Sequence, residues 1–258
     1  MNIPTDNTVD ILEYMRSVML DEMRAVRLMN RIDSKFVAPA SLFRPLIEDI
    51  APRFRVQSND GRRMIPYRTQ YLDTPRMDFF VMHHNGRLNR QKIRIRTYED
   101  SGVSFLEIKN KNNCGRTDKI RIPVCVAHIS SVDDFEESHL RFLDKNAAFD
   151  AAGLQPSLSS SFDRITLVNE SATERITVDL NLSFLNYTTG REIHVENLMI
   201  LELKRAGRQP SSFRDTLQRL RIKPHAFSKY CMGSVLTNPY LKYNCFKSKW
   251  IYINRIIH

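Results

Sequence analysis

A run of alternating basic residues in the middle of the chain is the feature with the clearest chemistry. Arg90, Lys92, Arg94 and Arg96 are spaced two residues apart. Side chains two apart on a β-strand share a face, so an extended segment over 90–98 places these four cations in one row. A guanidinium group binds two phosphate oxygens at once, and a lysine adds a compact positive charge. The spacing therefore predicts a strand face that binds phosphate groups.

Neighbouring segments repeat this alternation of charged and apolar residues. An antiparallel sheet with one solvated face also alternates in this way. The other explanation is a barrel with the charged faces turned inward, because like charges on adjacent strands destabilise a sheet unless a bound anion offsets them. We expect such a cationic tunnel. The phosphate-binding residues that these strand faces add are Arg31, Arg90, Lys92, Lys111, Lys119, Arg121 and Lys204.

Two carboxylates interrupt the expected cationic lining. Glu107 and Glu202 each lie on a segment in which charged and apolar residues alternate. A carboxylate is a poor neighbour for phosphate unless a divalent cation lies between them, and Mg²⁺ is commonly held by one or two carboxylates together with substrate phosphates. The residues therefore predict a metal–triphosphate site, with Glu202 and Glu107 as ligands of Mn²⁺ or Mg²⁺. The four cysteines form no CxxC pair and the histidines form no HExxH, so a zinc site is not expected.

The periodicity along the chain predicts the elements that must position these residues. The order of helices and antiparallel strands predicts an α+β fold built on a large sheet or barrel. The expected strands cover 28–37, 67–73, 90–98, 103–111, 118–126, 157–168, 174–182 and 198–206. The expected helices cover about 8–25, a short segment opened by Pro39, 77–84, 131–152, 211–220, 228–237 and 245–257.

Composition narrows the classes of partner. The 258 residues carry a formal net charge of +10, which favours a polyanion: nucleic acid, an anionic membrane surface or a phosphate-rich molecule. No apolar run approaches the roughly 20 residues of a membrane span, and no secretory signal is visible, so we expect a cytoplasmic protein with reduced thiols.

Aromatic residues do not interleave with the cations of 90–96, which argues against specific nucleic-acid binding. The apolar residues of 245–257 fit either a helix on a membrane surface or one docked on the sheet.

A set of short motifs gives the chain a family resemblance. With these motifs in the order given below, the chain resembles the VTC domain, which is the catalytic domain of the vacuolar transporter chaperone complex. It also resembles the stand-alone bacterial relatives of that domain, the polyphosphate polymerases. The motifs are RIDSKFV (31–37), YLDT (71–74), RQKIRIRTY (90–98), FLEIKNK (105–111), DKIRIPV (118–124), SFDRITL (161–167), RITVDLNL (175–182), LELK (201–204) and FSKYCMG (227–233).

The resemblance implies a triphosphate-tunnel fold, an eight-stranded antiparallel barrel flanked by helices, as one domain over residues 1–258. It also implies an ATP-dependent polyphosphate polymerase, which transfers the γ-phosphoryl group of ATP to a growing polyphosphate chain and releases ADP, with Mn²⁺ or a similar metal. The family's catalytic positions match Lys35, Arg94, Arg96, Lys109, Arg164 and Lys229, and its metal-binding glutamate matches Glu202. Lys111 stands where a eukaryotic member can carry histidine, so its role is open.

Alternatives of two other kinds stay open. Hydrolases and cyclases of the wider tunnel superfamily begin with ExExK, whereas residues 31–35 read RIDSK, and this loss of the first glutamate favours the polymerase over a triphosphatase. A triphosphatase acting on inorganic or nucleoside triphosphates on the same fold, or a module that only binds polyphosphate or RNA, remains possible. Arg164 and Asp179 could also form an ordinary cross-strand pair, and Lys229 could be a solvated helix residue. The oligomeric state is not predicted.

Overall fold

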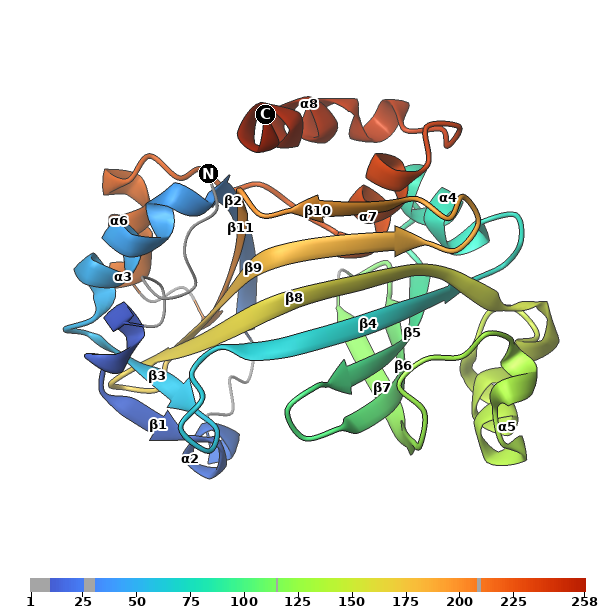
Figure 1. Ribbon diagram of the computed structural model, residues 1–258, viewed down its shortest axis with the longest axis horizontal. Helices are drawn as coiled ribbons and strands as arrows, with labels where there is room; N and C mark the ends of the chain where they lie inside the picture. The colour runs from blue at the N-terminus through green and yellow to red at the C-terminus, as the bar shows by residue number, and fades with distance from the viewer. Residues whose placement is uncertain (1–9, 26–30, 115, 208–209) are drawn as a thin grey trace.

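The computed structural model describes residues 10–25, 31–114, 116–207 and 210–258 (Figure 1). Its centre is one eleven-stranded sheet, in which the strands follow the order β2-β11-β9-β8-β4-β5-β6-β7 with every neighbouring pair antiparallel. The strands of this path are β2 (Arg31–Pro39), β4 (Ile65–Asp73), β5 (Arg90–Tyr98), β6 (Val103–Lys111), β7 (Thr117–Val124), β8 (Gln155–Asn169), β9 (Glu174–Asn186) and β11 (Leu198–Ala206).

Three short strands lie off this path. β3 (Phe54–Ser58) pairs with β8, β1 (Ser17–Met19) pairs in parallel with β3, and β10 (Glu192–Val195) pairs with β9. In Figure 1 the long strands β9, β8 and β4 cross the view side by side, while β2 with β11 and β5 with β6 and β7 turn away from them at the two ends.

The sheet curves without closing into a barrel. Within the described residues no ladder joins β7 to β2, so the closed ring that the family resemblance implied is open at this point. Lys109 on β6 and Lys35 on β2 are close enough for their positive charges to repel each other across the interior. The result is a curved antiparallel sheet around a charged interior, which is compatible with a tunnel.

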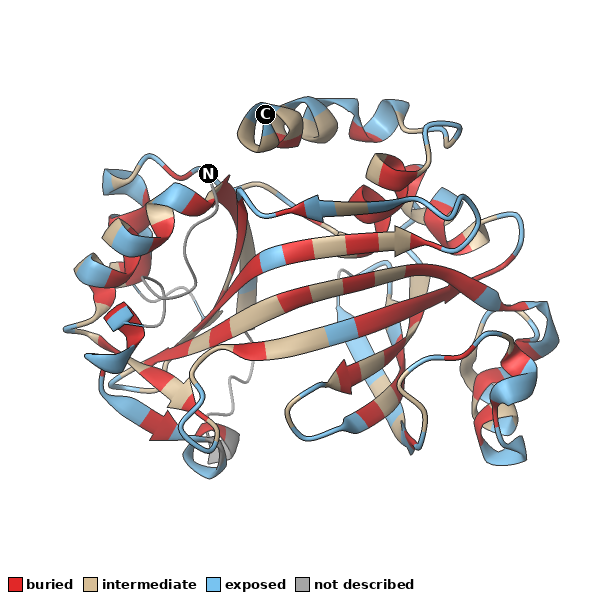
Figure 2. Cartoon of the chain, viewed as in Figure 1, coloured by how far each residue is buried: buried red, intermediate tan, exposed pale blue. Residues whose placement is uncertain are grey.

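Helices pack on the outside of this sheet and over one end of its interior. Figure 2 shows the consequence as an alternation of buried and less buried residues along the strands. The helices are α2 (Leu20–Ala25), α3 (Phe43–Ile50), α4 (Asp78–His84), α5 (Glu137–Asn146), α6 (Ser212–Arg219), α7 (Lys229–Thr237) and α8 (Lys247–Ile257). Short 3₁₀ turns cover Ala40–Leu42, Val132–Asp134, Ala151–Gly153 and Asn244–Phe246.

The N-terminal segment differs from its prediction. Instead of one helix over 8–25, residues 10–13 are helical, residues 17–19 form β1, and α2 follows; residues 8 and 9 lie outside the described ranges. Val18 is 1% exposed and Met19 is 55% exposed, an alternation that suits a strand against β3. Pairing with a strand of the sheet has overridden the helical spacing of the apolar residues.

The C-terminal helix docks on the sheet, as one of the two expectations for it stated. Ile253 of α8 is fully buried, and the Tyr252 hydroxyl donates to the Val37 carbonyl of β2 at 3.0 Å. In the part of the chain that the structure describes, no helix combines the length and the apolar character needed to cross a membrane.

Candidate functional site

The arginine-bearing strand has the two faces that its alternation predicted. Ile93 and Ile95 of β5 are fully buried in a core that also contains Leu106 and Ile108 of β6. Because neighbours on a strand point to opposite sides, Arg94 and Arg96 face the concave interior. The cationic row therefore lies inside the curved sheet.

Glu107 of β6 is the counterion of this row. Its side chain is fully buried, and Nε and Nη2 of Arg94 donate to Oε2 at 2.9 and 2.7 Å. Lys119 Nζ donates to Oε1 at 3.1 Å, and Arg96 Nε lies 3.9 Å from Oε2. Burial raises the pKa of this carboxyl, but the three cations outweigh it and bring the pKa to about 2. Glu107 is thus ionised and shared among three cations.

Asp179 of β9 forms a second cluster. Arg164 Nε and Nη2 donate to Oδ1 and Oδ2 at 2.7 and 2.8 Å, a two-pronged contact, and Lys229 also donates to Oδ2. Burial opposes ionisation of Asp179, yet Arg164 and Lys229 hold its pKa well below the usual range. The cross-strand pair considered for Arg164 is confirmed. Lys229 is only 12% exposed, so it is not a solvated helix residue.

Glu202 of β11 forms the third cluster, with lysines rather than arginines. Lys35 Nζ lies 2.5 Å from Oε1, and Lys204 Nζ lies 3.2 Å from Oε2. Burial opposes ionisation here too, but Lys204 and Lys35 keep the pKa of Glu202 well below normal. The glutamate is 16% exposed, and Lys35 is 37% exposed.

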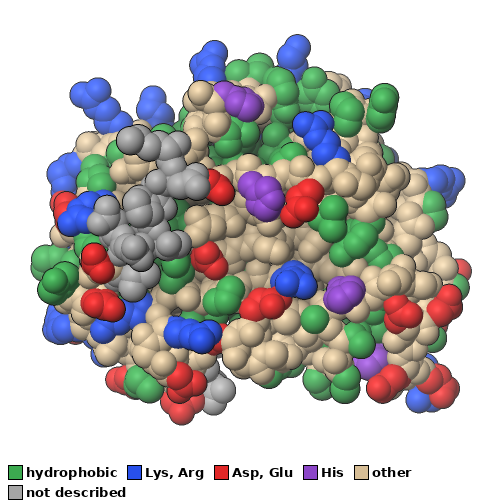
Figure 3. All heavy atoms as spheres, viewed as in Figure 1, with side chains coloured by type: hydrophobic (Ala, Val, Ile, Leu, Met, Phe, Trp, Pro, Cys, Tyr) green, Lys and Arg blue, Asp and Glu red, His purple; other side chains and the backbone are tan. Residues whose placement is uncertain are grey.

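The three clusters share one interior. Arg164 interacts electrostatically with Glu202, Arg96 with Arg164, and Lys109 with both Arg94 and Glu202. Seven cations contact three carboxylates in these clusters, which leaves a formal excess of four positive charges. Figure 3 shows that the face in view carries scattered charges of both signs.

A cavity of about 1230 Å³ opens beside the Glu202 cluster. It is large enough for a nucleotide or a short phosphate chain. Its charged lining is Asp33, Lys35, Arg90, Lys92, Lys109, Lys111, Arg116, Glu202 and Lys249. The cavity thus brings together five of the lysines and arginines predicted to bind phosphate with the predicted metal ligand Glu202, whereas Glu107 is not part of its wall.

Three lysines in or near this cavity have pKa values well below the ordinary 10.5 of lysine. Burial lowers the pKa of Lys92 to about 8, and the pKa of Lys229 also falls to about 8, mainly through burial. Lys92 Nζ donates to Ser228 Oγ at 2.9 Å, at the start of α7. Partial burial and then the positive charge of the nearby Arg94 lower the pKa of Lys109 to about 8 as well. An anion that binds among these amines stabilises their protonated forms.

Of the other residues predicted to bind phosphate, three have contacts in the structure and one has a side chain that is not described. Lys119 contacts Glu107 and Lys204 contacts Glu202, while the Arg121 guanidinium lies 4.1 Å from the centre of the Phe105 ring. The backbone of Arg31 belongs to β2, but its side chain lies outside the described residues.

Aromatic residues that the sequence did not single out contact two of the cations predicted to be catalytic. The guanidinium of Arg164 lies 5.1 Å from the centre of the Tyr67 ring, and Lys229 Nζ lies 3.9 Å from that of Phe162. Cation–π contacts of this length stabilise and orient a cation. The alternation of 65–73 and 155–169 places both rings on the inner face, but only the strand order shows which cations they meet.

The donor set for a metal consists of single carboxylates. Among the described residues, no three His, Cys, Asp or Glu side chains come together as a metal site. Mn²⁺ or Mg²⁺ bound by one carboxylate and several phosphate oxygens needs no such group. Glu202 fits this arrangement, because it lines the cavity and is 16% exposed. Glu107 is enclosed by three cations and fits it less well.

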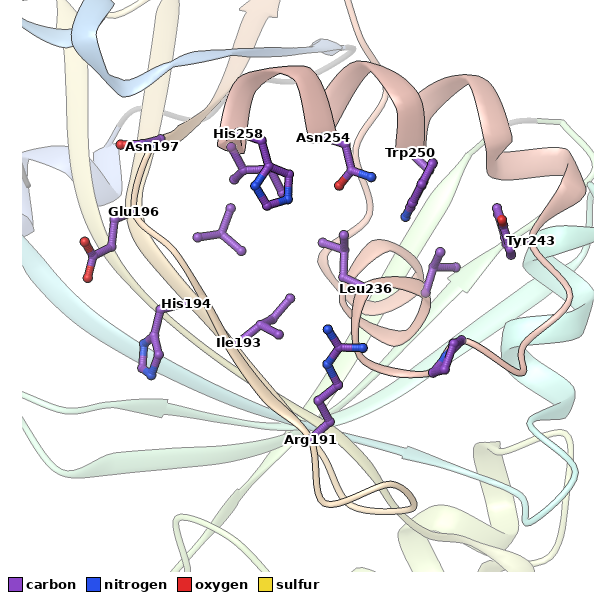
Figure 4. A pocket seen from close by; sticks show the side chains of 14 residues that line it. Arg191, Ile193, His194, Glu196, Asn197, Leu236, Tyr243, Trp250, Asn254 and His258 are labelled. Carbon is purple, nitrogen blue, oxygen red and sulfur yellow. The ribbon is translucent and has the colours of Figure 1, made fainter. Parts of the chain in front are cut away.

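A second cavity of about 630 Å³ lies outside the sheet, among β10, α7 and α8 (Figure 4). Arg191, Trp250 and His258 are among its lining residues, and their types are mixed rather than cationic. No residue of the predicted phosphate site lies in it. The chemistry predicted from the sequence therefore belongs to the interior of the sheet.

Comparison with known proteins identifies one matching family and several solved structures of similar fold. The model of the VTC domain matches residues 30–238. A candidate adenylate cyclase from Bacillus halodurans aligns with a TM-score of 0.50 at 14% identity, over 78% of this chain and 96% of its own. HpAC1 from Hippeastrum, a candidate adenylyl cyclase described with a dominant triphosphatase activity, aligns with a TM-score of 0.47 at 13% identity, over 84% and 99%. No curated protein matches.

Proposed function

The chain belongs to the VTC domain family, and we propose that it is a metal-dependent polyphosphate polymerase. In this reaction the oxygen at the end of a polyphosphate chain attacks the γ-phosphorus of ATP. The bond from that phosphorus to the β–γ bridging oxygen breaks, and ADP leaves. The observation that carries the proposal is the excess of positive charge over carboxylate on the inner face, next to a cavity large enough for a nucleotide or a short phosphate chain.

The chemistry asks little of the protein beyond position and charge. The attacking oxygen already belongs to a phosphate anion, so no side chain has to remove a proton from it. Arg94, Arg96 and Arg164 are suited to hold phosphate oxygens through their planar groups, and Lys35, Lys109 and Lys229 supply mobile positive charge. Together they would neutralise the charge that builds on the bridging oxygen as the bond breaks.

Mn²⁺ or Mg²⁺ would be held by Glu202 and phosphate oxygens, and when bound it withdraws electron density from the phosphates. Lys35 and Lys204 would then exchange their contact with Glu202 for contacts with phosphate. Because both amines are close to the carboxylate, this exchange requires only side-chain rotation. The same residues can therefore balance the empty site and organise the filled one.

A triphosphatase is the second candidate, and the open cavity favours it. Lys109 is exposed where it lines the cavity, so water reaches the phosphate-binding residues. The same inner face would then transfer the phosphoryl group to water rather than to a chain. Against this stands Arg31, in the position where hydrolases of the tunnel superfamily carry their first glutamate.

The deciding experiment follows the products of purified protein incubated with ATP and Mn²⁺ or Mg²⁺. The polymerase predicts ADP together with an acid-stable phosphate polymer, and both products should disappear when EDTA removes the metal. Orthophosphate without polymer selects the triphosphatase. Binding of polyphosphate with neither product would identify a module that binds without chemistry.

A further inference from the structure

Three residues in one row across the inner face carry buried polar atoms with no hydrogen-bond partner. Ser160 on β8, Thr69 on β4 and Arg96 on β5 lie directly opposite one another in the strand register. Thr69 and Ser160 are each 1% exposed. Within the described residues, Thr69 Oγ1, Ser160 Oγ and Arg96 Nε all lack a partner. A buried polar group without a partner destabilises a fold, so three in a row call for an explanation.

The contacts of neighbouring residues show that this row faces the interior. Tyr67 and Tyr71, two residues on either side of Thr69, contact Arg164 and Arg94. Gln70 points the other way, where its amide nitrogen donates to the Ile129 carbonyl at 2.8 Å. On β8, Phe162 lies beneath Lys229 and shares a face with Ser160.

Positively charged side chains lie next to this row. Arginine and lysine side chains can only donate hydrogen bonds, and the positive charges that act on Arg96 include those of Arg94 and Arg164. The nearest carboxylate to Arg96 is Glu107, whose Oε2 is 3.9 Å from Nε, too far for a hydrogen bond. Among the described residues, two hydroxyls and one N–H therefore remain without a hydrogen-bond partner beside several cations. A phosphate group provides several acceptor oxygens and the matching negative charge.

We propose that Thr69 and Ser160, together with Arg96 Nε, form a neutral-donor subsite for oxygens of the phosphate chain. The inference rests on the proposed function, because it takes the phosphates of the same substrate as its ligand. It adds two uncharged residues to a site otherwise built from cations. Hydroxyl donors bind a phosphate oxygen without adding positive charge to an interior that already has an excess of it.

The chain contains a matched control for these hydroxyls. Thr97 and Ser104 lie on β5 and β6, are 3% and 4% exposed, and share a hydrogen bond of 2.9 Å between Oγ1 and Oγ. Thr97 alternates with Arg96 and so points to the other face of β5. It is as buried as Thr69, but its hydroxyl has a partner and does not face the phosphate-binding interior.

The test compares Thr69→Val and Ser160→Ala with Thr97→Val in the full chain. The probes are inorganic triphosphate and ATP, with binding measured by calorimetry and stability by thermal melting without ligand. We expect Thr69→Val and Ser160→Ala each to weaken both ligands by roughly tenfold, the order expected for a hydrogen bond to a charged group. Their ligand-free melting temperatures should equal or exceed that of the wild type. Thr97→Val should melt lower, because Ser104 loses its partner, and should bind both ligands as the wild type does.

Three results would overturn the subsite. Unchanged binding of triphosphate by both variants removes the hydroxyls from the phosphate site. Weaker binding of ATP alone moves them to the nucleoside. A fall in ligand-free melting temperature as large as that of Thr97→Val makes them structural. Wild-type protein that binds triphosphate but yields no polymer contradicts the proposed polymerase and leaves the subsite standing, so the two failures are distinguishable.

Discussion

Two nearly identical tetrapeptides, Leu-Glu-Ile-Lys at 106–109 and Leu-Glu-Leu-Lys at 201–204, face the same interior in different ways. In the first, Glu107 is fully buried and is held by two arginines and a lysine. In the second, Glu202 is 16% exposed, its ion-pair partners among the described residues are lysines, and it lines the large cavity. The same local sequence has thus produced a closed ion cluster on β6 and an accessible one on β11.

The neighbouring strands cause this difference. Glu107 lies opposite Arg94 on β5 and Arg121 on β7, whereas Glu202 lies opposite Lys35 on β2 and Thr177 on β9. An arginine beside a carboxylate forms a rigid planar contact, but a lysine holds it through one mobile charge. Glu107 is thus held as a counterion on three sides, and Glu202 is the more accessible carboxylate, which we propose as the metal ligand.

The largest effect is expected from Glu202→Gln. The amide cannot replace an ionised ligand, so metal-dependent turnover of ATP should fall by about 100-fold or more. Stability should change less than in the Glu107 variant, because Lys35, the nearer partner of Glu202, is 37% exposed and can reach solvent. Product formation with titrated Mn²⁺ and ligand-free thermal melting measure the two quantities. A large drop in melting temperature with turnover retained would make Glu202 a structural ion pair.

Glu107→Gln should show the opposite pattern. Removal of the carboxylate leaves Arg94, Arg96 and Lys119 without their counterion, which should cost roughly 3 kcal/mol of stability. For a chain of this size that loss lowers the melting temperature by about 6–12 °C. Inorganic triphosphate should restore much of the loss, because its charge replaces that of the glutamate. A normal melting temperature combined with lost metal dependence would instead place Glu107 among the metal ligands.

The two central arginines sharpen the comparison within the Glu107 cluster. Arg94→Ala should destabilise the ligand-free protein, since it takes two hydrogen bonds from a buried carboxylate, whereas Arg96→Ala should have a smaller effect. The simple repulsion expected from the row of cations would have made both variants more stable. Both should bind triphosphate at least about tenfold more weakly, because each loses charge-assisted hydrogen bonds. Equal ligand-induced shifts in melting temperature for both variants and the wild type would exclude these arginines from the site.

Alternation of charged and apolar residues was sufficient to predict the central strands. The expected 90–98, 103–111 and 198–206 are the observed bounds of β5, β6 and β11, because a period of two is a local property. The N-terminal helix was less predictable. Val18 fits the apolar face of a helix in the sequence. Its segment instead forms a strand that pairs with β3, and this pairing cannot be predicted from the local pattern of residues. The short strands β3 and β10 were missed for the same reason.

In the candidate site, too, local features could be predicted from the sequence and long-range contacts could not. Which residues face the interior could be predicted from alternation, and Arg94, Lys109 and Glu202 all lie there. Which cation neutralises which carboxylate could not, because it depends on the order of strands in the sheet. Lys35 and Glu202 are 167 residues apart in the chain and meet because β2 pairs with β11. The unpaired hydroxyls of Thr69 and Ser160 likewise emerge only when three strands are placed side by side.

The smallest effect expected is a dependence of binding on pH between about 7 and 9. Lys92 and Lys229 have ordinary pKa values of 10.5 that fall to about 8 in the folded protein, chiefly through burial. Between those values the unfolded chain binds more protons than the folded one, so the contribution of these groups to ligand-free stability rises with pH. The affinity for triphosphate should fall over the same range, because the amines lose their charge.

The pH range of the effect separates the lysines from the carboxylates compared above. Glu107, with its pKa of about 2, remains ionised throughout this range, and its contribution to stability is lost only as the pH falls from its ordinary value of 4.5 toward 2. Calorimetry at pH 8.5 in buffers of different ionisation enthalpy should therefore detect proton uptake when triphosphate binds. Lys92→Met should reduce that uptake and flatten the dependence of affinity on pH. Uptake that is unchanged in this variant would mean that Lys92 stays outside the reach of the phosphate chain.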